Sequence, residues 1–298
     1  MEPLNYEKRG YLNEPFRLFH LADDKHEKIP YHYHSFHKII ILLAGRAGYA
    51  IEGERYALQP GDYVLVGRGS IHKPIVEQND FYERAILYIS PEYLQQLSTP
   101  DCDLERCFRQ AQEEFRYVYH AGADRIRELF SLLEQVQQEG TFGAALLRQA
   151  LFTQLMVEVN RVCLTSGTVS AADGDSKIIA ILQYLNTHLT EPLTLDQLAS
   201  HFFISKGTLC HTFKKKTSFT VVTYINMHRI RYACILLREG YSVQETCTKS
   251  GFTSTEHFIR TFTAFVNTTP GKYAKSLRNG QNVSIPLAVY KTDPDEPE

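Results

Sequence analysis

Three histidines occupy six consecutive positions near the start of the chain, in the run HYHSFHKIIILLAG at residues 32–45. His32 and His34 are separated by one residue, so on a β-strand their side chains point to the same face. Imidazole nitrogens bind zinc and copper, and they also hydrogen-bond small polar ligands. The run therefore predicts either a metal site or the wall of a ligand pocket.

The segments around these histidines have the pattern of short strands, and helical patterns follow. β-Rich runs separated by glycine turns occupy residues 37–45, 48–58, 61–69 and 83–90. Glu52, Glu54 and Asp62 fall in the turns, where we expect solvated side chains. Apolar residues recur at helical spacing over residues 104–164 and again over residues 177–278.

Composition and charge suggest two domains of different character. The 298 residues are 43% hydrophobic and 22% charged, as in an ordinary globular protein. Residues 1–175 carry 18 Lys and Arg against 25 Asp and Glu, whereas residues 176–278 carry 13 against 5. A basic second half indicates a nucleic-acid-binding module. The polar run at 165–176 is typical of a linker, and 279–298 of a flexible tail.

The location of the protein is predicted from what its sequence lacks. No apolar run approaches the roughly 18 residues of a membrane helix, and the start MEPLNYEKRG is not a signal peptide. The six cysteines are scattered without C-x-x-C spacing, so we expect reduced thiols. These features predict a cytoplasmic protein.

The second half contains an internal repeat. LTLDQLASHFFISKGTLCHTFKKKTSFTVVTY aligns with YSVQETCTKSGFTSTEHFIRTFTAFVNTTPGKY, and the matched pairs are Ala199 and Cys247, Phe203 and Gly251, Phe213 and Phe262, and Tyr224 and Tyr273. Each half predicts a short helix, a tight turn and a second helix, which is a helix-turn-helix pattern. Gly251 suits a turn with positive φ better than Phe203 does. A long amphipathic helix at 221–240 can hold two recognition helices about one DNA turn, roughly 34 Å, apart.

This repeat resembles the AraC-type family of transcription regulators. The signature residues are Gly251–Phe252, Phe258, Phe262, Thr269–Pro270 and Tyr273, and the resemblance is strong over 185–277. The chain departs from the family pattern at Ser218, Thr263 and Asn267. The resemblance implies an all-α double helix-turn-helix domain that binds promoter or operator DNA, with RNA polymerase as a further partner if the protein is an activator.

The same resemblance implies which residues contact DNA. In the first half these are Ser205, Lys206, Gly207, Thr208, Cys210, His211, Lys214 and Lys215, and in the second half Ser254, Thr255, Glu256, His257, Arg260 and Thr261. Arg260 is the best base-reading candidate, because a guanidinium can pair with both guanine acceptors. The lysine run 214–216 has the composition of a solvated helix end, but within this repeat we expect it to hold phosphates.

The first half resembles the cupin β-barrel. His32, His34 and Gly45 keep the spacing of the first cupin motif, and Gly61, Gly69 and His72 keep that of the second. Metal-binding cupins place a glutamate where this chain has Lys38. An ammonium group has no lone pair to donate and repels a divalent cation. We therefore expect no metal cofactor, and His32, His34 and His72 remain the candidate ligands if one binds.

Two other roles are open to these side chains. They can be interior residues that are simply hydrogen-bonded, or they can line an effector pocket, as in AraC-type regulators with a cupin-like sensor. We favour the pocket, with the lining His32, His34, Lys38, Tyr49, His72, Arg84 and Tyr88. The resemblance favours a sugar or sugar derivative as effector, and Lys38 favours an acid-bearing one.

We predict a multidomain α and β protein. A cupin-like effector-binding and dimerisation domain spans 1–164, a linker 165–176 and a DNA-binding domain 177–278. The leucine stripe at 124–164 either covers the barrel or joins two subunits. The resemblance implies a homodimer through Leu129, Leu133, Leu147 and Leu151.

The predicted function is a sequence-specific transcription regulator controlled by a small effector. We expect no enzyme, because the sequence has no G-x-S-x-G, phosphate-loop or dinucleotide motif. The alternatives are a cupin metalloenzyme with an accessory DNA-binding domain, and a ligand-independent regulator that uses the barrel only for dimerisation.

Overall fold

The computed structural model divides the chain into two compact units, 1–29 with 33–173 and 30–32 with 174–298. The structure describes residues 12, 14–24, 29, 31–34, 36–77, 80–120, 122–138, 140–165, 176–217 and 219–278. We call the unit that contains residues 33–173 the β unit, and the unit that contains residues 174–298 the helical unit. The predicted tail 279–298 and all but the two end residues of the predicted linker 165–176 lie outside the described residues. The domain boundaries therefore stay a prediction.

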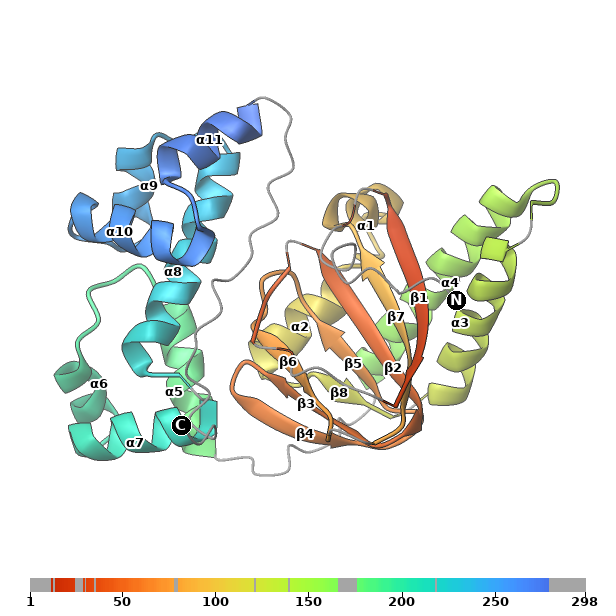
Figure 1. The fold of residues 1–298 in the computed structure, drawn as a ribbon, viewed down its shortest axis with the longest axis horizontal. Helices are drawn as coiled ribbons and strands as arrows, with labels where there is room; N and C mark the ends of the chain where they lie inside the picture. Colours follow the sequence, from red (N-terminus) through yellow and green to blue (C-terminus); the bar gives the residue numbers. More distant parts are fainter. Residues whose placement is uncertain are drawn as a thin grey trace. The chain divides into compact units, whose positions relative to one another are not determined.

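The β unit is built on two antiparallel sheets (Figure 1). Across the larger sheet the strands are β1 (Phe16–Asp23), β7 (Tyr82–Ile89), β2 (His37–Gly45), β5 (Tyr63–Val66) and β8 (Val118–Tyr119). Across the smaller sheet they are β4 (Glu54–Leu58), β3 (Ala47–Ile51) and β6 (His72–Ile75). The four predicted strand regions are confirmed. The sequence reading missed β1, β6, which contains Pro74, and the two-residue β8.

The centre of the larger sheet is buried on both faces. Residues Ile39 to Leu42 of β2 form an unbroken apolar run that is inaccessible to solvent. Such a run indicates a strand covered on both sides. One face of β2 is covered by α2 (Arg106–Glu114), where Phe108 stacks on His37 with ring centroids 4.3 Å apart.

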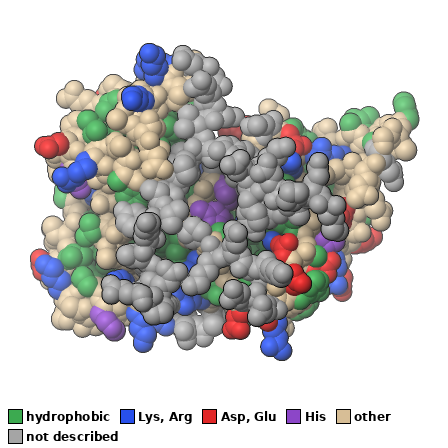
Figure 2. Space-filling view, viewed as in Figure 1, with side chains coloured by type: hydrophobic (Ala, Val, Ile, Leu, Met, Phe, Trp, Pro, Cys, Tyr) green, Lys and Arg blue, Asp and Glu red, His purple; other side chains and the backbone are tan. Residues whose placement is uncertain are grey.

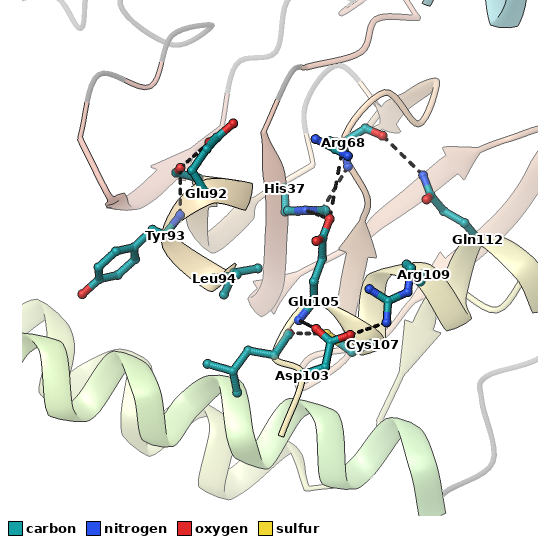
Figure 3. Close-up of polar contacts among 12 residues, drawn as sticks. His37, Arg68, Glu92, Tyr93, Leu94, Asp103, Glu105, Cys107, Arg109 and Gln112 are labelled. Carbon is teal, nitrogen blue, oxygen red and sulfur yellow. Dashed lines mark hydrogen bonds and ion pairs between the residues drawn. The ribbon is translucent and has the colours of Figure 1, made fainter. Parts of the chain in front are cut away.

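His37 fixes α2 to the sheet through a buried polar network (Figure 3). Its Nε2 donates to Glu105 Oε1 at 3.0 Å, and its Nδ1 accepts from the backbone N–H of Arg68 at 3.1 Å. Gln112 of α2 adds a hydrogen bond to Ser70 Oγ at 2.8 Å. Burial lowers the pKa of His37, so the ring is neutral near pH 7. The third histidine of the opening run is therefore a structural residue.

Three more helices complete the β unit: α1 (Pro91–Leu97), α3 (Ala123–Gln138) and α4 (Ala144–Thr165). The last two form a helical hairpin beside the sheet (Figure 1). Leu129 and Leu133 are almost fully buried on the inner side of α3, whereas Leu147 of α4 is about half exposed. The prediction that Leu129 and Leu133 contact a second subunit is therefore wrong, because the stripe on α3 packs within its own chain.

The helical unit contains seven helices among the described residues. They are α5 (Ser176–Thr187), α6 (Leu195–His201), α7 (Lys206–Thr217), α8 (Val221–Arg238), α9 (Val243–Lys249), α10 (Thr255–Val266) and α11 (Pro270–Arg278). None of the described helices in either unit is long and apolar enough to cross a membrane.

The predicted repeat is confirmed as two helix-turn-helix pairs, α6–α7 and α9–α10. Both short helices begin with a capping box, Thr194 with Gln197 in α6 and Ser242 with Glu245 in α9. Two matched aromatic pairs are buried, Phe213 with Phe262 and Tyr224 with Tyr273, whereas Phe203 is exposed. The same sequence pattern has therefore produced the same local structure twice.

Candidate DNA interface and effector site

The two second helices of the repeat each bury one face and expose the other. Leu209 and Phe213 anchor α7, and Phe258 and Phe262 anchor α10. The opposite faces carry most of the predicted DNA contacts. Exposed there are Lys206, Gly207, Thr208, His211, Lys214 and Lys215 of α7, and Thr255, Glu256, His257 and Arg260 of α10.

Ser205 and Ser254 precede these helices and hydrogen-bond their first turns. Ser205 Oγ accepts from the N–H of Thr208 at 3.0 Å, and Ser254 Oγ accepts from that of His257 at 3.3 Å. Both serines are exposed, so each can also meet a phosphate at the positive end of its helix. Sequence reasoning found the residues but not this capping role.

Two predicted contacts are less accessible. Thr261 is 8% exposed and lies on the buried face of α10, three residues after Phe258. The expectation that Thr261 contacts DNA is therefore wrong. Cys210 of α7 is only partly exposed.

The two helices differ in charge. The last turn of α7 carries Lys214, Lys215 and Lys216, whereas α10 exposes Arg260 together with Glu256. Figure 2 shows Lys and Arg side chains spread over the visible face of the helical unit. The lysines of α7 can bind DNA phosphates, and such contacts do not depend on the base sequence. Arg260, on the exposed face of α10, can hydrogen-bond to the edge of a base.

Helix α8 connects the two pairs and is anchored at its centre. Its 18 residues span about 27 Å. Arg229 Nε donates to the carbonyl of Leu189 at 2.8 Å, and its Nη2 donates to that of Glu191 at 2.7 Å. These hydrogen bonds attach the turn after α5 to α8, the helix that connects the two helix-turn-helix pairs.

In the β unit, the structure brings together six of the seven residues predicted to line an effector pocket. We call Lys38, Arg84, Tyr88, Tyr49, His34 and His72 the interior cluster. Lys38 of β2 is paired with Tyr88 of β7, and Arg84 lies four residues before Tyr88 on the same face of β7. His32 belongs to the segment 30–32, which groups with the helical unit.

Tyr49 and His72 of the smaller sheet and His34, in the segment before β2, complete the interior cluster. The ring centroid of His34 is 5.8 Å from that of Tyr88 and 5.3 Å from that of His72. His72 in turn stacks on Tyr49 of β3 at 5.9 Å. The Nδ1 of His72 is 2.8 Å from the carbonyl of Ser70, which fixes the ring. The six side chains thus form one connected set.

Asp23 and Tyr82 also belong to this region, and sequence reasoning missed both. Arg84 Nη1 lies 2.7 Å from Asp23 Oδ2, and the guanidinium stacks 4.2 Å from the ring centroid of Tyr82. Asp23 ends β1, a strand that the sequence pattern did not reveal. Tyr82 stands two residues before Arg84, a spacing that places both on one strand face.

The turn carboxylates are not solvated. Glu52, Glu54 and Asp62 are all buried, contrary to expectation. Glu52 Oε1 accepts from the backbone N–H of Ile71 at 2.8 Å, and Asp62 Oδ2 accepts from that of Gln59 at 2.7 Å. Asp62 thus closes a local turn and Glu52 links two distant segments, and the backbone hydrogen bonds that both accept compensate for their loss of water.

Both halves of the chain match known protein families. Residues 16–156 match the family model described as AraC-like ligand binding domain, and residues 198–276 match the one described as helix-turn-helix domain. The chain belongs to the AraC family of transcription regulators. Its fold class, a β-rich ligand-binding domain followed by a helical DNA-binding domain, is thereby established together with the predicted family.

Relatives of this AraC-family chain are similar along most of their length. The transcriptional activator RhaS of Salmonella arizonae is 29% identical over 85% of this chain and 88% of its own. RhaS of Escherichia coli is 27% identical over the same shares. Among solved structures, ToxT of Vibrio cholerae is 14% identical over 88% of this chain and 98% of its own, with a TM-score of 0.36.

Proposed function

We propose that this AraC-family protein is a transcription activator that binds promoter DNA through α7 and α10 and responds to a sugar or sugar derivative held by the interior cluster. The observation that carries the proposal is the duplicated construction of the two exposed helix faces. Each is capped by a serine, anchored by buried apolar residues and lined by polar or basic side chains. Two equivalent faces on one frame suit two successive major grooves.

Activation is supported by similarity, and a sugar effector by the side chains of the interior cluster. Relatives that share the whole two-domain arrangement are named transcriptional activators. An activator needs RNA polymerase as a partner in addition to DNA. The interior cluster supplies hydroxyl, imidazole and cationic groups, which suit the hydroxyls of a carbohydrate.

A homodimer through the outer face of α4 is part of the proposal. Leu146 is 74% exposed, and with Ala150, Thr153 and Val157 it lines an open groove along this helix. An exposed apolar groove on a helix that also packs α3 indicates a protein contact. A two-fold dimer would double the number of DNA half-sites.

Fluorescence anisotropy tests the DNA-binding part of the proposal. The full chain is titrated onto the labelled upstream region of its own gene and onto a shuffled duplex, at several salt concentrations. We expect tight, salt-sensitive binding to the first and weaker binding to the second. Equal affinity for both duplexes would contradict sequence-specific regulation.

A matched pair of variants separates phosphate binding from general charge. Lys214→Ala with Lys215→Ala removes two cations from α7, and Lys272→Ala with Lys275→Ala removes two from α11. The first pair is expected to weaken binding to both duplexes and to reduce the salt slope by about 2, whereas the second changes it less. Equal losses would show that only net charge matters.

A further inference from the structure

Lys38 is a basic side chain buried inside the β unit. It lies in the middle of the larger sheet, in register with Tyr88 on one side and Val66 on the other, and is only 7% exposed. Its Nζ is 5.8 Å from the ring centroid of Tyr88. Among the described residues no carboxylate forms an ion pair with it. A buried charge without a partner is destabilising, so its presence calls for an explanation.

The neighbouring charges make this environment more positive. Arg84, on the same strand face as Tyr88, is 5% exposed, and its guanidinium forms an ion pair with Asp23. The carboxylate of Asp23 is therefore engaged by Arg84. Burial first, and the Arg84 charge second, lower the pKa of Lys38 to about 7. An anion placed beside Lys38 would favour the charged form and raise this pKa.

The opposite wall of the interior cluster offers hydrogen-bonding groups. The hydroxyl of Tyr49 is buried and has no hydrogen-bond partner among the described residues. The rings of His72 and His34 lie next to it in the connected set. A buried hydroxyl without a partner is costly, and a ligand hydroxyl would satisfy it.

We propose that the effector is a sugar acid, whose carboxylate pairs with Lys38 and whose hydroxyls are held by Tyr49. This inference rests on the proposed function, in which the interior cluster holds the effector, and it narrows the effector to one chemical class. The acid supplies the missing negative charge, while Arg84 stays paired with Asp23. A neutral sugar satisfies Tyr49 equally well but leaves Lys38 without a partner.

Isothermal titration calorimetry on the full chain tests the inference with matched ligands. Each hexose and pentose of a panel is compared at pH 7 with its own alditol, aldonic acid and uronic acid. We expect one acid to bind at least ten-fold more tightly than its neutral counterparts. Because burial lowers the pKa of Lys38 to about 7, part of the Lys38 side chains are neutral at pH 7, and binding of that acid should be accompanied by net proton uptake, measured in buffers of different ionisation enthalpy.

Variants assign the effect to Lys38. Lys38→Gln should remove both the preference for the acid and the proton uptake. Lys73→Gln, which changes a partly exposed lysine on β6, should retain both. The wild-type comparison of acid with neutral ligand needs no variant, so it decides the question even if Lys38→Gln does not fold.

Three results would contradict the proposal of a sugar acid. A neutral sugar that binds as tightly as its acid overturns the inference, as does the absence of binding by any acid up to 10 mM. Unchanged acid binding by folded Lys38→Gln overturns it too. Anisotropy on the same preparation keeps the two proposals apart, because specific DNA binding that a neutral sugar alters would preserve the proposed function and exclude the sugar acid.

Discussion

Phe203 occupies in the first helix-turn-helix the position that Gly251 occupies in the second, and both have positive φ. The φ angles are 53° for Phe203 and 85° for Gly251. Each residue follows the C-cap of its short helix, and the next residue donates a backbone hydrogen bond back into that helix, Ile204 to Ala199 and Phe252 to Cys247. Two turns of the same geometry thus tolerate very different side chains, because their surroundings differ.

Gly251→Ala is expected to destabilise the helical unit by about 2–3 kcal/mol. A Cβ at this position would lie 2.8 Å from Thr190 Cα, and the φ of 85° also disfavours alanine. Urea unfolding followed by circular dichroism measures the change. Gly271→Ala is the control, since a Cβ there meets nothing within 4 Å and the residue lies in α11. Equal stability of both variants would contradict the close approach to Thr190.

Phe203→Asn is expected to stabilise the helical unit by about 0.5–1 kcal/mol. The Phe203 side chain is 92% exposed, so its removal costs little packing, while asparagine tolerates the left-handed conformation better. The same unfolding measurement applies. A loss of stability would mean that the ring of Phe203 makes contacts that its exposure does not reveal.

Arg260→Ala is expected to relax preference at one base position and to weaken specific binding by about 1–3 kcal/mol. Arg260 is exposed on α10, one turn beyond Glu256, and is free to reach a base edge. Selection from a randomised duplex library shows whether preference is lost at a single position. Arg278→Ala removes the same charge from the end of α11 and should leave the preference unchanged. Unchanged selectivity of Arg260→Ala would remove Arg260 from the base-reading residues.

The repeat was predictable because its determinants are local. The matched residues of each half lie within about 35 positions of sequence, so Phe213 and Phe262 could be matched from the sequence, and the structure buries both. The packing partner of the leucine stripe on α3 could not be predicted from the sequence in this way. A stripe such as that of Leu129 and Leu133 has the same spacing whether it packs on a helix of its own chain or on a second copy.

The interior cluster was predictable in composition but not in its charge balance. Lys38, Tyr88 and Arg84 could be placed on one face by strand alternation. The ion pair of Arg84 with Asp23 depends on β1, which pairs with β7 over a separation of some sixty residues. The burial of Glu52 likewise depends on a distant backbone N–H, that of Ile71. Such long-range contacts leave no periodic signal in the sequence.

Leu146→Glu is expected to weaken self-association of the protein. Leu146 lines the groove of α4, and burying a carboxylate in an apolar contact is costly. Analytical ultracentrifugation over a range of concentrations measures the dimer dissociation constant. Leu164→Glu is a matched control on the same helix, about half exposed and outside the groove. A wild-type monomer, or equal association of both variants, would contradict the proposed interface.

Lys38→Met is expected to flatten the pH dependence of stability of the β unit. In the folded chain the pKa of Lys38 is about 7, below its ordinary value of 10.5, so the unfolded chain binds more protons between these values. Stability therefore rises with pH across this window, and the contribution of Lys38 between pH 7 and 8.5 is about 1.5 kcal/mol. Below pH 7 the full penalty of charging the buried amine is present.

Pulse proteolysis in urea, which reads the β unit and the helical unit as separate fragments, measures this contribution. Every other titratable group is common to wild type and Lys38→Met, so the difference between their pH profiles isolates Lys38. Lys38→Met should also be the more stable protein at pH 7, because methionine is buried without losing a hydrated charge. Lys73→Met, on a partly exposed strand position, should keep the wild-type profile. Parallel profiles for wild type and Lys38→Met would show that Lys38 keeps an ordinary pKa, and would remove the uncompensated charge on which the preference for an acid depends.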